Sequence, residues 1–309
     1  MHKRTTFRLL PSAVHNSFLW SLGKCCYVLP LFLLMTGCVP MPEDALREMT
    51  PLSQANEPPY TGLEPGFKTY ETAHFLVKAY TNDLAVAYSV VCEQNYGRVM
   101  NDLGLYSFAP ARPYNIVVYR DAEEFFKKTG QPRWSGGMAY GNAILVYESE
   151  GASAILAHEM THLIFNEFMS LRNSDDFKWI NEGVAVYEEN RASPASRAAY
   201  NRRLVELVTP NPIPFSQLVS LAPPGRSEAS SEHGIGAAST RDPAANTAVE
   251  RWYAQVGSVA SFMINEGGTL GFSIFISRLK AGDVTDVAVS TAFPGLWRNL
   301  ADMERAWLL

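Results

Sequence analysis

The chain has 309 residues, of which 47% are hydrophobic and 18% are charged, and its formal net charge is −5. A chain of this length and apolar content can build a sizeable core in one or two domains, and its composition excludes collagen, a coiled coil and global disorder. The acidic balance makes nucleic acid an unfavourable partner, because phosphate contacts need lysine and arginine.

The N-terminus has the pattern of a secretory signal. Basic residues precede a short apolar run, Cys25 to Met35, which is too short to cross a bilayer comfortably and suits the hydrophobic part of a signal peptide. The following LLMTGC resembles a bacterial lipobox, in which a peptidase cleaves before a cysteine that carries lipid, here Cys38. The alternative is an uncleaved membrane helix over residues 18–39, which contain one charge, Lys24. In either case we expect the rest of the chain to lie outside the cytoplasm.

Cleavage before Cys38 divides the chain into a signal peptide (1–37), a lipidated tether (38–66) and a folded part (67–309). The signal carries four basic and no acidic residues, so its removal takes the net charge from −5 to −9. The tether is rich in proline and polar residues, which is typical of a semi-extended linker. We expect a protein of the bacterial cell envelope, anchored to the membrane by lipid on Cys38. Val39 in place of an aspartate resembles a signal for the outer membrane, facing the periplasm.

The first part of the folded region, residues 67–150, is predicted to be rich in strands. Aromatic and β-branched residues indicate strands over 71–80, 114–120 and 136–147, the last as one strand or a hairpin. Asn82 is the predicted N-cap of a helix that ends before Gly104. A second, short helix is predicted to end at Gly130.

From residue 151 to 309 the pattern is helical. Apolar periodicity and helix breakers predict helices over 152–169, 177–190, 194–208, 247–265 and 270–280, followed by two short helices. Residues 222–246 are small and polar and predict a long, mobile loop. An N-terminal half that contains strands and a helical C-terminal half together predict an α+β fold with an N-terminal mixed sheet.

The stretch AILAHEMTHLIFNEF carries two histidines and a glutamate in an otherwise apolar helix. Burying such groups is costly unless a partner satisfies them. Positions i and i+4 share one helix face, so His158 and His162 can present two imidazoles to one tetrahedral zinc ion at roughly 2.0–2.1 Å. Glu159 is offset from that face but can reach a water at the metal. The pattern His-Glu-x-x-His is typical of zinc proteases. The alternative is a core helix whose histidines find local hydrogen bonds.

A second segment, WINEG, follows after a turn and could return antiparallel to the first helix. HEMTH followed by WINEG resembles the gluzincin metallopeptidases, in particular the branch called peptidase MA-like. The resemblance implies that His158, His162 and Glu182 bind one zinc ion per chain and that Glu159 is the catalytic base. It extends in outline over residues 67–309 and implies a lipid-anchored, zinc-dependent peptidase.

The chain departs from this family at one position. Many gluzincins have an acidic residue four positions after the ligand glutamate, where it orients a histidine, and here that position is Val186. Glu189, two helical turns after Glu182 on the same face, is a candidate substitute, and an ordinary solvated charge is the competing interpretation. Val186 therefore leaves open another class of function, a catalytically inactive binding or scaffolding lipoprotein of the same fold.

Two further features could complete a peptidase site. The oxyanion that forms during peptide hydrolysis needs a hydrogen-bond donor. Tyr253 is the candidate, and core packing of its ring is the alternative. A peptide or protein substrate could pair with the edge of a strand that contains Gly136, Gly137, Met138 and Ala139. The alternative for this strand is a plain hairpin.

Overall fold

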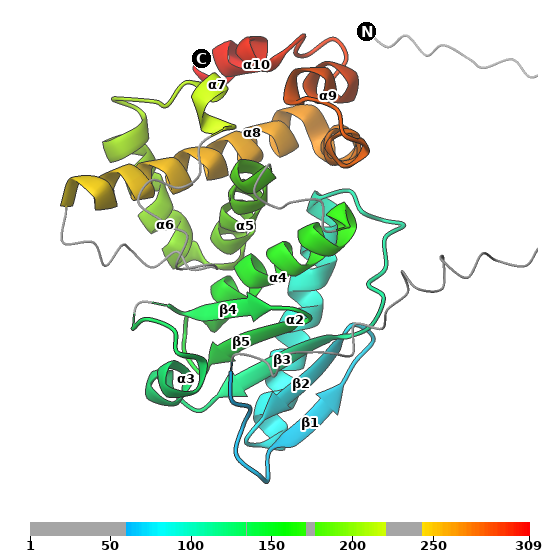
Figure 1. Cartoon of the computed structure of the whole chain (residues 1–309), viewed down its shortest axis with the longest axis vertical. Helices are drawn as coiled ribbons and strands as arrows, with labels where there is room; N and C mark the ends of the chain where they lie inside the picture. The colour runs from blue at the N-terminus through cyan, green and yellow to red at the C-terminus, as the bar shows by residue number, and fades with distance from the viewer. Residues whose placement is uncertain (1–59, 134, 171–176, 221–242) are drawn as a thin grey trace, which may run out of the picture. The chain divides into compact units, whose positions relative to one another are not determined.

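The computed structural model describes residues 60–133, 135–170, 177–220 and 243–309. Within this part of the chain, a mixed five-stranded sheet with helices on both faces is followed by a helical second half (Figure 1). The predicted α+β class and its N-terminal mixed sheet are therefore confirmed. The predicted signal peptide, Cys38 and most of the predicted tether lie outside the described residues.

The sheet has the strand order β1-β2-β3-β5-β4. Three parallel strands form its centre, namely β2 (Phe75–Ala79), β3 (Tyr114–Tyr119) and β5 (Ala143–Tyr147). Antiparallel strands flank them on the two sides, β1 (Lys68–Glu71) beside β2 and β4 (Gly137–Tyr140) beside β5. β3 and β5 are almost entirely buried, as parallel strands covered by helices on both faces usually are. β4 is therefore an edge strand of the sheet.

Two of the predicted strands are each divided in the structure. The strand predicted over 71–80 is β2, but it is shorter than predicted, because a turn at Thr72 separates it from Glu71, the last residue of β1. The backbone N–H of Thr72 donates to the carbonyl of Phe75 at 2.9 Å, and its hydroxyl accepts from the N–H of Phe75 at 3.1 Å. The segment 136–147 is the predicted hairpin, β4 and β5, which turns at Gly141 with a φ of 57° that glycine adopts without strain.

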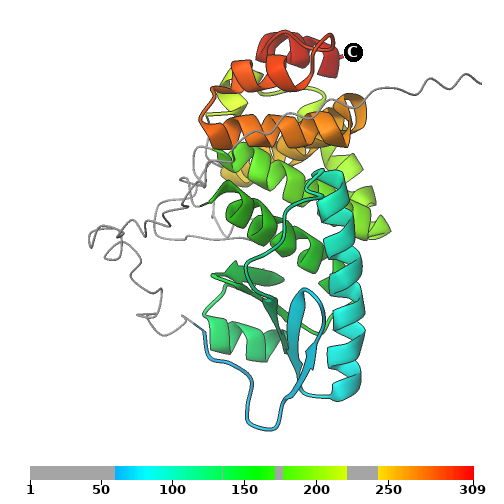
Figure 2. The same ribbon diagram turned by 90° about the vertical axis from the view of Figure 1, so that its right-hand side faces the viewer.

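Helices cover the two faces of the sheet. α2 (Asn82–Asp102) packs against β1 and β2 and continues along α4 (Ala152–Met169). α3 (Ala122–Thr129) lies on the opposite face, as the turned view shows (Figure 2). The large core lies between the sheet, α2 and α4 and continues through α5 and α8 into the helical half, and a smaller apolar cluster lies beneath α3.

The ends of these helices follow local chemistry. Thr81, and not the predicted Asn82, is the N-cap of α2, because its hydroxyl accepts from the N–H of Leu84 at 3.1 Å. Gly104 follows the end of α2 with a φ of 64°, and Gly130 ends α3 with a φ of 70°. Both glycines stand where the sequence predicts the helices to end.

The packed chain begins before the predicted boundary at Phe67. Tyr60 and Leu63 pack on the smaller apolar cluster. The N–H of Thr61 donates to the carbonyl of Lys128 at 2.8 Å, and this lysine also donates to the backbone of the same segment. The end of the predicted tether therefore belongs to the folded part, because α3 holds it in place.

Helices α4, α5 (Lys178–Ala192) and α8 (Pro243–Ala281) are stacked from the sheet outward (Figure 1). α5 approaches α8 closely because glycines lie at their crossing. A Cβ atom on Gly183 would lie 2.6 Å from a backbone carbonyl oxygen of α8, and one on Gly257 would lie 2.6 Å from Cγ1 of Val186. Neither position has room for a side chain at the observed separation of the helices.

The remaining helices agree with the predicted helical C-terminal half. They are α6 (Pro194–Arg203), η2 (Leu204–Val208), α7 (Phe215–Leu218), α9 (Thr285–Ala292) and α10 (Leu300–Trp307). α8 contains the two helices predicted over 247–265 and 270–280, joined at Gly268, whose φ of 73° and ψ of 158° are not helical. The predicted loop 222–246 lies mostly outside the described residues, and its last residues already belong to α8.

The segment Asn246–Ala281 of α8 is long and apolar enough to cross a membrane, with a mean hydropathy of 1.3 over its most apolar window. Core helices of soluble proteins pass the same test of length and composition. Here α8 packs against α5 on one side and α9 on another, so it forms the core of the helical half.

We expect Gly183→Ala to destabilise the fold, because the new methyl group meets backbone of α8 rather than a movable side chain. Overpacking of this kind costs about 1–3 kcal/mol, and the better helix propensity of alanine returns up to about 1 kcal/mol. The free energy of unfolding in urea should therefore fall by roughly 1–2 kcal/mol. The control is Gly97→Ala in α2, an exposed position with nothing within 4 Å, which should raise stability. Equal effects of the two substitutions would contradict a tight helix crossing.

Candidate metal centre

The candidate site is built on α4, an 18-residue helix that is buried over most of its length. The prediction of a helix over 152–169 is confirmed. Because α4 is apolar on nearly all sides, it packs as a core helix and carries its few polar residues inside. His158, Glu159 and His162 are 3%, 1% and 0% exposed. The i, i+4 spacing places the two imidazoles next to each other, with ring centroids 4.7 Å apart.

Glu182, near the start of α5, completes a group of three ligand-type side chains. Its Oε2 lies 3.8 Å from Nε2 of His158 and 3.6 Å from Nε2 of His162. The two Nε2 atoms are 3.1 Å apart. An ion equidistant from three atoms at these separations would be about 2.0 Å from each, which matches zinc–nitrogen and zinc–oxygen bonds in proteins. These three buried side chains, the His/His/Glu group, could hold a metal ion.

The outer nitrogens of both rings contact side chains of α5. Nδ1 of His162 lies 2.9 Å from Oδ1 of Asn181, and Nδ1 of His158 lies 3.2 Å from Oε2 of Glu189. Asn181 is itself oriented, because its Nδ2 donates to Oδ1 of Asn166 at 3.1 Å. The amide oxygen of Asn181 accepts, so the ring of His162 carries a proton on Nδ1, and the carboxylate of Glu189 pairs with the ring of His158. The Nε2 atoms of both rings face the group and would bind a metal ion after losing any proton that they carry. This pairing is how proteins orient histidines that bind metals.

The charges around the site favour a cation. Burial alone would lower the pKa of His158, but the hydrogen bond from its ring to Glu189 and the negative charges of Glu159, Glu189 and Glu182 outweigh burial and raise that pKa to about 9. Three carboxylates thus lie beside two buried imidazoles, and only that of Glu189 is partly exposed. A divalent ion bound by the His/His/Glu group would compensate this negative charge, which buried carboxylates otherwise tolerate poorly.

Glu159 lies beside the His/His/Glu group without belonging to it. Burial is the largest effect on this carboxyl and raises its pKa to about 7, with a further increase from Glu182. The charge of His158 and the backbone N–H of Ala139, which donates to Glu159, act in the opposite direction. A carboxyl that titrates near neutral pH can accept a proton and return it, which is what a general base in hydrolysis must do.

Two glycines hold β4 against the helix that carries these residues. A Cβ atom on Gly136 would lie 2.4 Å from Cδ1 of Ile155, and one on Gly137 would lie 2.6 Å from Cγ2 of the same side chain. The close approach of β4 to α4 brings the N–H of Ala139 to Glu159. The glycines therefore have a packing role, and the binding of substrate along β4 stays a prediction.

Glu189, and not position 186, provides a carboxylate beside His158. Val186 packs against Gly257 of α8 and does not face the histidines. Glu189, one turn further along α5, reaches Nδ1 of His158 with a side chain that is only 20% exposed. The interpretation of Glu189 as an ordinary solvated charge is therefore wrong.

The other predicted site residues lie on α8, on β4 and outside the described part of the chain. Tyr253 is 8% exposed in α8, with its ring edge-to-face against Trp252 at a centroid distance of 5.1 Å. Its catalytic role stays a prediction. Met138 lies in β4 and packs into the smaller apolar cluster. Cys38 lies outside the described residues.

Sequence reasoning missed Asn181, and it assigned Ala139 to substrate binding without its contact with Glu159. A signal for Asn181 was available, because it directly precedes the ligand glutamate in WINEG and belongs to the same helix turn. Ala139 contacts Glu159 through its backbone N–H, and almost every residue type has such a group, so the sequence does not indicate this contact. Only the pairing of β4 with β5 and its contact with α4 place that N–H beside Glu159.

Comparison with known protein families, curated proteins and solved structures finds no match to this chain. The function must therefore be inferred from the site itself. That site is a buried His/His/Glu group able to hold a metal ion, carried on two adjacent helices beside a mixed sheet.

Proposed function

We propose that the protein is a zinc-dependent peptidase, which hydrolyses peptide bonds outside the cytoplasm. The observation that supports this most strongly is the convergence of three ligand atoms from His158, His162 and Glu182, with the buried carboxyl of Glu159 beside them. Two imidazoles and one carboxylate suit zinc, and three protein ligands leave a position open for chemistry. The resemblance of HEMTH and WINEG to the gluzincins supports the same reaction.

A zinc ion held by this group would supply a Lewis acid that polarises the scissile carbonyl and lowers the pKa of water to near 7. Glu159 would then take the proton of the attacking water and deliver it to the leaving amine. The burial of Glu159 keeps that proton from exchanging freely with solvent. Asn181 and Glu189 hold the two rings so that both Nε2 atoms stay directed at the site.

The alternative function is an inactive binding or scaffolding lipoprotein, which Val186 suggested. The contact between Glu189 and His158 weakens that alternative, because it provides the acidic partner that position 186 lacks. Turnover of a mixed-peptide library by purified wild-type protein separates the two functions. One zinc ion per chain without turnover would favour the alternative.

Glu159 and Glu182 should respond differently to substitution, although both carboxylates lie at one site. We expect Glu159→Gln to retain about one zinc ion per chain and to lose hydrolysis, because an amide cannot accept the proton. Glu182→Ala should lose zinc, lose hydrolysis and melt at a lower temperature, because metal binding is coupled to folding. The measurements are zinc stoichiometry, thermal melting and cleavage of the mixed-peptide library.

Two outcomes would contradict these assignments. Zinc binding by Glu182→Ala as tight as that of the wild type would exclude Glu182 as a ligand. A wild-type protein that binds no zinc, together with variants of unchanged activity, would mean that the histidines of α4 are core residues and that the peptidase proposal is wrong.

We expect Glu189→Gln to weaken zinc binding by roughly 10–100-fold, the range typical of residues that orient ligating histidines. The glutamine can still accept from Nδ1 of His158 but no longer provides the negative charge that makes the ring more basic. The control is Glu167→Gln at the other end of α4, whose carboxylate accepts from Tyr114 and the N–H of Ala111 instead. Competition with a chelating dye measures both affinities. Equal losses in the two variants would show that Glu189 has no specific role.

Tyr253→Phe tests the proposed donor to the oxyanion. The substitution keeps the ring that packs against Trp252 and removes only the hydroxyl. Loss of one such donor typically lowers kcat about 10²–10³-fold, and zinc content should not change. A kcat within about twofold of the wild-type value would assign Tyr253 to the core alone.

We also propose that the protein is anchored by lipid on Cys38, at the outer membrane facing the periplasm. The supporting observation is the sequence LLMTGC after a short apolar run. Cys38→Ser should abolish labelling with a radioactive fatty acid and leave an unprocessed precursor in cell fractions. Normal processing of this variant would favour an uncleaved membrane helix or another cleavage site.

A further inference from the structure

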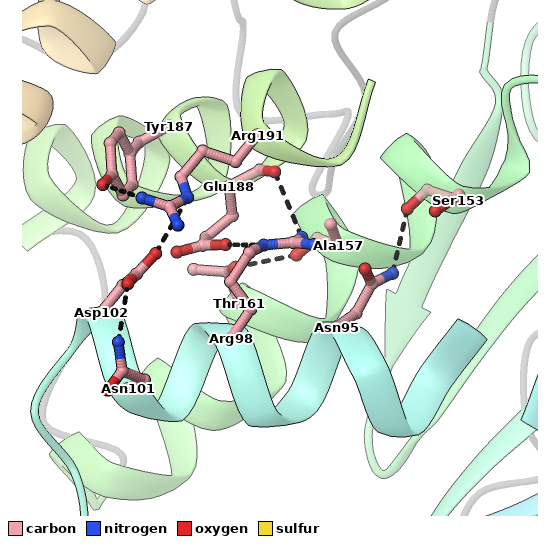
Figure 3. Close-up of polar contacts among 10 residues, drawn as sticks. All are labelled: Asn95, Arg98, Asn101, Asp102, Ser153, Ala157, Thr161, Tyr187, Glu188 and Arg191. Carbon is pink, nitrogen blue, oxygen red and sulfur yellow. Dashed lines mark hydrogen bonds and ion pairs between the residues drawn. The ribbon is translucent and has the colours of Figure 1, made fainter. Parts of the chain in front are cut away.

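One face of α2 carries polar side chains into the core. Asn95, Arg98 and Asp102 follow the spacing i, i+3 and i+7, so they share one side of the helix. Asn95 is 2% exposed and Asp102 is 4% exposed. Figure 3 shows all three side chains directed away from α2, toward α4 and α5. We call these three residues the polar face of α2.

The polar face of α2 binds both helices that carry the His/His/Glu group. Asn95 donates from Nδ2 to a backbone carbonyl in the first turn of α4 at 3.1 Å. Arg98 donates from Nε to Oε2 of Glu188 at 2.8 Å and from Nη2 to the carbonyl of the same residue at 3.4 Å. Asp102 forms an ion pair with Arg191, whose Nε lies 3.1 Å from its Oδ2 (Figure 3). The polar contacts of this face therefore join α2 to α4 through one amide and to α5 through two ion pairs.

The pair between Arg98 and Glu188 is not an obvious source of stability. The side chain of Glu188 is fully buried, and burial is the main reason why its pKa rises to about 7, with Asp102 adding to the rise and Arg98 opposing it. Replacing a buried ion pair with apolar residues of similar volume is often neutral or stabilising. What apolar packing cannot provide is a directional contact that fixes one rotation of a helix.

The rotation of α5 decides whether the metal site exists. Glu182 and Glu189 are seven residues apart and share the face toward α4, whereas Glu188 projects from a different face, toward α2. A rotation of α5 by about 20° would move a carboxylate about 6 Å from the helix axis by roughly 2 Å, which is the full length of a metal–ligand bond. Holding Glu188 therefore holds Glu182 and Glu189.

We propose that Arg98 and Glu188 are positioning residues of the metal centre, and that their ion pair fixes the rotation of α5 so that Glu182 and Glu189 meet the two histidines. This inference rests on the proposed metal centre. Neither residue touches the site itself. They act through α5, and Asn95 holds α4 to the same face of α2.

The test replaces both charges at once, so that no unpaired charge stays buried. In the full chain, Arg98→Met with Glu188→Leu should remain folded and melt within a few degrees of the wild type, or above it. Zinc affinity, measured by competition with a chelating dye, should fall roughly 10–100-fold, the range seen when the groups that orient metal ligands are lost. The visible spectrum of the cobalt-substituted protein should also change, because its bands report the geometry of the ligands.

A matched control uses another charged pair of the same helix. Glu93 of α2 pairs with Nδ1 of His74 at 2.7 Å and faces the sheet rather than α5. Glu93→Gln should leave the zinc affinity and the cobalt spectrum unchanged. If the double variant does not fold, Arg98→Lys provides the test. Lysine keeps the charge but lacks the guanidinium group, whose separate N–H donors bind both the carboxylate and the backbone carbonyl of Glu188. This substitution should lower zinc affinity several-fold with a near-normal melting temperature.

The outcomes separate this inference from the proposed function. A folded double variant, or Arg98→Lys in its place, with wild-type zinc affinity and a wild-type cobalt spectrum would overturn the positioning role while the metal centre stands. An equal loss of affinity in Glu93→Gln would also overturn it. A wild-type protein that binds neither zinc nor cobalt would overturn the metal centre, and the positioning role with it.

Discussion

The structure depends on the contact between α4 and α5, where polar groups in an apolar helix meet the partners that satisfy them. His158 and His162 are buried by the packing of α4, and neither ring could remain there without acceptors for its N–H groups. α5 provides an amide oxygen to one ring and a carboxylate to the other. The same helix directs Glu182 at the two remaining nitrogens. The packing of α5 on α4 thus gives the buried imidazoles their polar partners and also brings the three ligand-type side chains together.

Much of this site could be predicted from the sequence because it follows from helix periodicity. The spacing of His158 and His162 places them on one face, and Glu182 needed only a turn and an antiparallel return to reach them. The role of Glu189 could not be settled in the same way. Its position on the face of Glu182 was visible, but the choice between solvent and His158 depends on the distance between two helices. That distance is set by tertiary packing, which a local pattern does not contain.

The fold shows the same division between local and distant causes. Helix ends at Gly104 and Gly130 were predictable because left-handed backbone favours glycine. The division of the predicted strand over 71–80 was not, since the turn there is closed by the side chain of Thr72 and aromatic residues continue on both sides of it. The ion pairs of the polar face of α2 join residues about ninety positions apart in the chain, and their sequence neighbours give no indication of such a contact.

α5 must satisfy three neighbours at once, and its sequence is divided accordingly. Gly183 and Val186 form the side that meets α8, where Gly183 has no room for a side chain and Val186 packs against Gly257. Glu188 meets α2 through an ion pair, and Glu182 and Glu189 meet α4. An acidic residue at position 186 would lie in the buried contact with α8, where a charge is costly unless a polar group pairs with it. The tight crossing of α5 and α8 therefore leaves position 189, three residues later, as the place on α5 from which a carboxylate reaches His158.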